Sequence, residues 1–178
     1  MCGYNSLTNL IGSPNHVSGE FGCYGNNITS LVGCPVSVGG DFYCNNNDLI
    51  GLIGCPTTIG GGFNCSNNNI SSLVGCIKEI VGGFYCYDNE LTNFIGCPIK
   101  VGNNFVCSGN KLSSLEYCSE YIGGDFDCSN NRLAKSELFL YNYNLEQIRQ
   151  YYISKNLNEK LLVELSEDAG VGIKKKKL

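Results

Sequence analysis

The sequence of 178 residues predicts a repeat solenoid, mainly β, in which short coils of the chain stack on one another. First, all twelve cysteines fall into two columns that recur every 21 residues. Second, asparagine, leucine, valine or isoleucine, and phenylalanine recur with the same period. Third, the 23 glycines and 23 asparagines favour turns over long helices. A coil of this length cannot bury its apolar side chains alone, whereas identical stacked coils can.

The two cysteine columns define a unit that reads C-x-x-N-x-L-x-x-L-x-G-C-P-x-x-V-G-G-x-F-x. Residues 1–133 hold about six full 21-residue copies and a partial seventh. The second column follows the first by 11 residues, with Ser13 in its first place. The first column is Cys2, Cys23, Cys44, Cys65, Cys86, Cys107 and Cys128, and the second continues with Cys34, Cys55, Cys76, Cys97 and Cys118. We expect both columns to point inward with the leucine, valine and phenylalanine columns.

The F-x-C segment of each unit predicts a short strand. Phenylalanine and cysteine alternate with one other residue, so both point inward and the residue between them points outward. Stacked, these segments predict a short-stranded parallel sheet along one side of the solenoid. The asparagine that follows each first cysteine by three residues is expected to satisfy backbone groups at the turn. Glycine pairs such as Gly39–Gly40 and Gly123–Gly124 are expected to permit positive φ or a close backbone approach before the strand.

The run F-x-C-x-x-N-x-L-x-x-L resembles the leucine-rich-repeat core L-x-L-x-x-N-x-L, with phenylalanine and cysteine in two leucine places. With its G-C-P and V-G-G segments, the short repeat is similar to repeats in hypothetical proteins of bacteria, phages and large DNA viruses. The resemblance covers residues 2–133. It implies a right-handed, leucine-rich-repeat-like coil that binds a partner, and it allows a viral or phage protein that captures a host factor.

The repeat pattern decays after Leu133, where lysine, glutamate, leucine and tyrosine become frequent. Asn144 followed by Gln147 resembles a capping box before apolar residues with helical spacing. We therefore predict an α-helical C-terminal cap over residues 134–170 and a basic flexible tail over residues 171–178.

At the other end, Met1 stands directly before the first strand cysteine. This arrangement predicts an uncovered strand edge, which invites pairing with another molecule. We expect association through the N-terminal coil, in the form of a head-to-head homodimer. The alternatives are that the first coil frays or that an upstream segment covers it.

Charge is divided unevenly along the chain. Residues 1–133 contain 4 basic and 10 acidic residues, a net charge of −6, whereas residues 134–178 contain 8 basic and 6 acidic residues, a net charge of +2. An acidic body repels phosphate, so we expect no nucleic-acid binding by the solenoid. No apolar run approaches the length of a membrane span, and no secretion signal is visible. We therefore expect a cytoplasmic protein without a membrane partner.

The sequence offers little for catalysis. Neighbouring cysteines alternate 11 and 10 residues apart, unlike the close pairs of structural zinc sites. The columns hold seven and five cysteines, so neither pairs completely as disulfides, and we expect reduced, buried thiols. His16, the single histidine, falls on a loop with no partner indicated by spacing. The glycine-rich segments lack the G-K-[ST] ending of phosphate loops. We predict no metal, no cofactor and no enzymatic activity.

The candidate binding surface is the outward face of the strands. Tyrosine provides a large contact area at a small entropic cost, which makes it a common interface anchor. The outward tyrosines also have acidic neighbours. The predicted site comprises Tyr24, Asp41, Tyr43, Tyr85, Tyr87, Asp125 and Asp127. We therefore expect a non-catalytic protein–protein interaction module whose partner is unidentified. Two alternatives remain: the tyrosines only reflect strand propensity, or the chain is a structural protein that self-assembles through its N-terminal edge.

Overall fold

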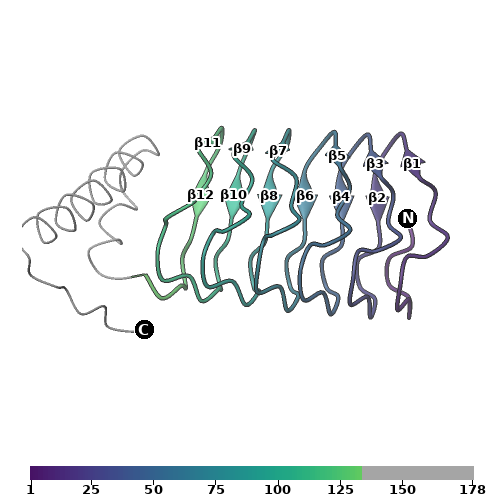
Figure 1. Cartoon of the computed structure of the whole chain (residues 1–178), viewed down its shortest axis with the longest axis horizontal. Coiled ribbons are helices and arrows are strands. Elements are labelled where there is room, and N and C mark those ends of the chain that lie inside the picture. Colours follow the sequence, from purple (N-terminus) through teal and green to yellow (C-terminus); the bar gives the residue numbers. More distant parts are fainter. Residues whose placement is uncertain (134–178) are drawn as a thin grey trace, which may run out of the picture.

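The computed structural model describes residues 1–133, which form a parallel β-solenoid of about five turns. The coils lie side by side along the long axis, and equivalent strands of successive coils form two rows (Figure 1). The predicted 21-residue repeat is therefore confirmed as the unit of the fold. The predicted helical cap, residues 134–170, and the predicted basic tail, residues 171–178, lie outside the described residues.

The first row is a six-stranded parallel sheet in which each strand begins at the phenylalanine of its unit. Its strands, in spatial order, are β2 (Phe21–Gly22), β4 (Phe42–Tyr43), β6 (Phe63–Asn64), β8 (Phe84–Tyr85), β10 (Phe105–Val106) and β12 (Phe126–Asp127). The register places each phenylalanine beside its counterpart in the next coil. Backbone bonds continue past the strands, because the Cys23 amide donates to the Tyr43 carbonyl at 2.8 Å. The predicted parallel sheet is confirmed.

A second row of strands was not predicted. It consists of two three-stranded parallel sheets, one of β1 (His16–Val17), β3 (Ser37–Val38) and β5 (Thr58–Ile59), and one of β7 (Glu79–Ile80), β9 (Lys100–Val101) and β11 (Tyr121–Ile122). Each strand has only two residues, of which one, a valine or isoleucine, points inward. A single inward residue gives no alternation from which a strand could be predicted.

The second row also corrects the expectation for His16, which lies in β1 and not in a loop. The register pairs His16 with Ser37, and its Nδ1 lies 2.7 Å from the Ser37 Oγ. His16 therefore has a partner at the equivalent position of the next coil, which residue spacing within one unit does not indicate.

The core is a set of like-on-like columns, as predicted. Phenylalanine rings of adjacent coils stack with centroid separations of 5.2–5.9 Å. The first cysteine column is buried from Cys23 to Cys128, and the second is buried at Cys76 and Cys97 and half-buried elsewhere. Phe94 takes a leucine place and packs edge-on against Phe105, with centroids 5.8 Å apart.

The asparagine column links successive coils. The Asn47 side chain donates to the carbonyls of Cys44, at 3.1 Å, and of Cys23 in the preceding coil, at 3.0 Å. Its Oδ1 accepts the Ile28 amide of the preceding coil at 3.0 Å. The predicted role of asparagine at the turn is confirmed, and the contact reaches backward along the chain. The same pattern occurs at Asn26, Asn68, Asn89, Asn110 and Asn131.

The glycine pairs serve close approach and not positive φ. A Cβ atom on Gly39 would collide with the Ser18 carbonyl of the preceding coil. Positive φ occurs instead at the glycine before the second cysteine column, for example Gly54 at +91°. It also occurs two residues after each first cysteine, for example at Asn46, whose φ is 55°. Asparagine, aspartate and glycine tolerate this left-handed conformation best, which explains their recurrence at that place.

Candidate functional site

The solenoid places all seven predicted site residues along the face of the first strand row. Their outward direction follows from alternation with the buried phenylalanines and first-column cysteines. Asp125 is exposed, and the other six are half-buried. The face therefore contains the predicted side chains, partly packed against the sheet.

Three tyrosines form a continuous aromatic row at the N-terminal end of this face. The Tyr4 and Tyr24 rings meet edge to face with centroids 5.2 Å apart, and the Tyr24 and Tyr43 rings do so at 6.5 Å. Tyr24 lies over Gly3, where a Cβ atom would collide with its ring. Tyr4 was missed by the sequence analysis because it stands where most units have glycine, asparagine or aspartate.

Asp41 and Tyr43 form one hydrogen-bonded unit across the buried Phe42. The Tyr43 hydroxyl donates to Asp41 Oδ2 at 2.7 Å, and the Gly62 amide of the next coil donates to Asp41 Oδ1 at 2.5 Å. The hydrogen bond to Asp41 raises the pKa of Tyr43 to about 12, so the hydroxyl stays protonated and able to donate well into the alkaline range. Both side chains are therefore held in a fixed orientation.

Small polar side chains separate the tyrosines of the middle coils. The register places Asn64 between Tyr43 and Tyr85. The Ser66 hydroxyl donates to Asn64 Oδ1 at 2.7 Å, which keeps both side chains close to the sheet. Tyr85 in turn lies over Gly83, where a Cβ atom would come within 2.7 Å of its ring. Large and small residues thus alternate along the face from coil to coil.

The predicted acidic residues at the far end are not brought together with the aromatic row. Asp125 and Asp127 lie in the last described coil, and Tyr43 and Asp127 occupy the same column four coils apart. At about 4.8 Å per coil, this separation is about 19 Å. The Ser129 amide donates to Asp127 Oδ1 at 2.9 Å. The face therefore has an aromatic end, which includes Asp41, and a separate acidic end with Asp125 and Asp127.

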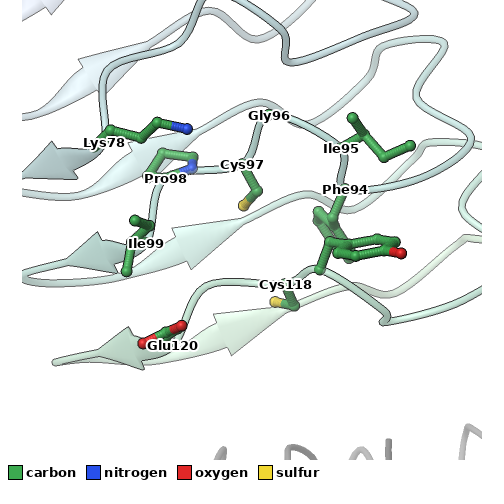
Figure 2. A pocket seen from close by; sticks show the side chains of 10 residues that line it. Lys78, Phe94, Ile95, Gly96, Cys97, Pro98, Ile99, Cys118 and Glu120 are labelled. Atoms are coloured by element: carbon green, nitrogen blue, oxygen red, sulfur yellow. The ribbon is translucent and has the colours of Figure 1, made fainter. Parts of the chain in front are cut away.

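A cavity of about 490 Å³ is a second feature, which the sequence analysis did not predict. Its walls include Phe94, Pro98 and Ile99, and Lys78 and Glu120 lie on either side of Ile99 (Figure 2). The repeat departs from its consensus here, and this departure is the sequence signal that could have indicated the cavity. Phe94 replaces leucine, Tyr117 replaces glycine, and Ser119 next to Cys118 replaces proline.

The cavity contains two cysteines, Cys97 and Cys118 (Figure 2). Burial raises the pKa of Cys97 to about 12, and it raises the pKa of Cys118 well above its usual value. Because the thiolate is the nucleophilic form, both side chains are poor nucleophiles at neutral pH. The cavity offers apolar walls with one basic and one acidic side chain at its edge.

Within residues 1–133, no cluster of three histidine, cysteine, aspartate or glutamate side chains is arranged to hold a metal ion. The same residues include no helix of the length and apolarity needed to cross a membrane. Comparison with protein-family models, with curated proteins and with solved structures finds no match for this chain.

Proposed function

We propose that this chain is a non-catalytic protein-binding module of the leucine-rich-repeat type, whose partner docks on the face of the first strand row. The observation that supports this proposal best is the Asp41–Tyr43 unit, in which the hydroxyl–carboxylate bond of 2.7 Å fixes two interface-type side chains on a rigid sheet. Binding then requires little ordering of the site.

The tyrosines provide the apolar contact area of the proposed interface. Tyr24 and Tyr85 lie over glycines, so their rings are supported from below and present one face to a partner. Tyrosine in a preorganised position is typical of the few residues that dominate interface energy. The smaller Asn64 between Tyr43 and Tyr85 leaves room for a protruding partner side chain.

The charge of the face indicates a basic partner. Glu20, Asp41, Asp125 and Asp127 stand in its outward columns, and among the described residues these columns contain no lysine or arginine. Such a surface attracts lysine and arginine, and arginine also stacks on tyrosine rings. A partner with arginines spaced between the two ends of the face fits this pattern.

A pull-down with matched variants tests the proposal. Wild-type chain, Tyr43→Ala, Tyr85→Ala and Tyr121→Ala are immobilised and exposed to lysate of the native host. Tyr121 is the control, because it is 53% exposed but lies in β11 of the second strand row. A protein retained by wild type and Tyr121→Ala but lost from both other variants supports the proposal. A protein retained equally by all four, or lost only from Tyr121→Ala, contradicts it.

A further inference from the structure

An exposed row of apolar side chains runs along the solenoid between the first and second cysteine columns. We call this row the apolar ladder. Each member directly follows the buried second leucine position of its unit, and their exposed fractions range from 53% to 80%. The ladder consists of Ile11, Val32, Ile53, Val74 and Ile95.

The turns hold the ladder residues in place. The Val32 amide donates to the Ser30 hydroxyl and the Val74 amide donates to the Ser72 hydroxyl, both at 3.2 Å. The next residue in each unit is a glycine with positive φ, and the Gly54 position lies so close that a Cβ atom would come within 2.7 Å of the Val32 amide nitrogen. Successive members are therefore stacked closely and in line.

The apolar ladder is larger than isolated exposed residues would explain. Five β-branched side chains at this exposure leave on the order of 500 Å² of apolar surface in water, within the range of the largest, often functional, patches on monomers. Ile95, at the end of the ladder, also lines the cavity of Figure 2. In the next unit Glu116 takes the equivalent place, so the apolar row ends there.

The spacing of the ladder favours a second ladder as its partner. Neighbouring coils are about 4.8 Å apart, whereas same-face side chains of a strand are about 6.6 Å apart and turns of a helix about 5.4 Å apart. Only a surface with the same repeat stays in register over the full length. Isoleucine and valine also alternate strictly along the row. An antiparallel copy shifted by one coil therefore sets Ile11 and Ile53 against valines and leaves Ile95 beyond the paired positions.

Charge favours the same partner. In each unit the ladder residue has three close neighbours in its turn: the residues two and three positions before it and the residue directly after it. In all five units these neighbours are threonine, serine, asparagine, glycine or, once, isoleucine, and none is charged. The strand face, in contrast, contains Glu20, Asp41, Asp125 and Asp127. Two copies of this acidic body repel each other across the strand faces but meet a neutral surface at the ladder.

We propose that two copies of this chain pack antiparallel through their apolar ladders. A twofold axis between the Val32 and Ile53 positions sets Ile11 against Val74 and Val32 against Ile53, and it leaves Glu116 outside the contact. The strand faces of both copies remain accessible, so the dimer presents two of them. This inference is independent of the proposed partner of the strand face.

Sedimentation velocity of the full chain over a wide concentration range tests this contact. The matched variants are Val74→Lys and Val81→Lys, which make the same change in the same repeat unit. Val74 belongs to the ladder, whereas Val81 is 68% exposed and lies between the two strand rows. We expect wild type and Val81→Lys to dimerise and Val74→Lys to raise the dissociation constant by about tenfold or more, since a charge would be buried without a partner.

Two results would overturn the proposal: a wild-type chain that stays monomeric at the highest concentration, or equal association of the two lysine variants. The second result would also follow from association through the N-terminal coil. Circular dichroism confirms that each variant is folded. If Val74→Lys does not fold, Val74→Thr replaces it, because threonine keeps the side-chain shape, and it should weaken the dimer relative to Val81→Thr.

Discussion

The Tyr43 hydroxyl and the Asp41 carboxylate, which flank the buried Phe42, are joined by a 2.7 Å hydrogen bond on the outward side of the first strand row. The outward residues on either side of Phe42, one just before β4 and one within it, thus form a single polar unit. The Gly62 amide of the next coil fixes its second carboxylate oxygen, so the unit depends on correct stacking of two coils.

Replacing the carboxylate should change how Tyr43 titrates. In wild type the hydrogen bond to Asp41 raises the pKa of Tyr43 from 10.0 to about 12. We expect Asp41→Asn to lower this pKa toward 10.0, because the anionic acceptor is removed. Ultraviolet absorbance of tyrosinate during alkaline titration measures the change. Asp125→Asn is the control, and equal tyrosine titration curves for wild type and Asp41→Asn would contradict the assignment.

Ionisation of the buried thiols should destabilise the fold at high pH. Burial raises the pKa values of Cys23, Cys55 and Cys97 from 9.0 to about 12. A folded-state pKa above the unfolded value contributes stability that is complete below pH 9.0 and is lost as the pH rises through about 12. We expect the urea midpoint, followed by circular dichroism, to fall across this window. Recovery on return to neutral pH with reductant separates ionisation from oxidation, and an unchanged midpoint would contradict the thiol burial.

Removal of one linking asparagine should be costly. Asn68→Ala leaves the buried Leu49 amide without its acceptor, and it removes one of the two asparagine donors from each of the Cys44 and Cys65 carbonyls. We expect the free energy of unfolding to fall by about 1 to 3 kcal/mol, mainly the cost of the buried amide left unpaired. Urea unfolding measures the loss. The neighbouring Asn69 is exposed, so Asn69→Ala should have a much smaller effect, and similar losses for both variants would refute the role of the column.

Truncation of the leucine column should open a cavity in the core. Leu52 is fully buried, and Leu52→Ala is expected to lower the free energy of unfolding by about 2 to 5 kcal/mol. Ile50, two residues earlier and 69% exposed, provides the control Ile50→Ala, for which we expect a small change. Thermal or urea unfolding of both variants checks the difference. A loss at Leu52 no larger than at Ile50 would contradict the inward assignment.

Once a strand-face partner is identified, the two central tyrosines should account for much of its affinity. We expect Tyr43→Ala and Tyr85→Ala each to weaken binding by about 1 to 2 kcal/mol or more, because supported aromatic rings dominate interface energy. Isothermal titration calorimetry with the purified partner measures both. Unchanged affinity in both variants would place the interface elsewhere on the solenoid.

The parts of the fold that follow from period and alternation could be predicted from sequence. The phenylalanine, cysteine, leucine and asparagine columns lie where the 21-residue repeat places them. The second strand row could not be predicted, because His16–Val17 and its equivalents contain a single inward residue each. Likewise, Asn46 adopts positive φ at a place where the units vary among several residue types, which hides the shared conformation.

The candidate site shows the same division. Alternation correctly predicted that Tyr43 and Asp41 face outward, but their mutual hydrogen bond depends on side-chain rotamers that no repeat pattern encodes. The apolar ladder was overlooked for another reason. Ile53 adjoins the buried Leu52 in sequence, and an apolar residue in an apolar segment is normally assigned to the core. Only the coil geometry separates them.

The backward reach of the asparagine column makes the array extendable. In each coil a backbone amide at the turn donates to the asparagine side chain of the coil that follows it, as the Ile28 amide does to Asn47. A whole unit inserted between two others thus supplies the asparagine that bonds the preceding unit. Its own backbone amide is bonded in turn by the asparagine of the following unit. Gain or loss of complete units by gene duplication or deletion therefore leaves every internal junction intact, so that such proteins can change length in evolution without being redesigned.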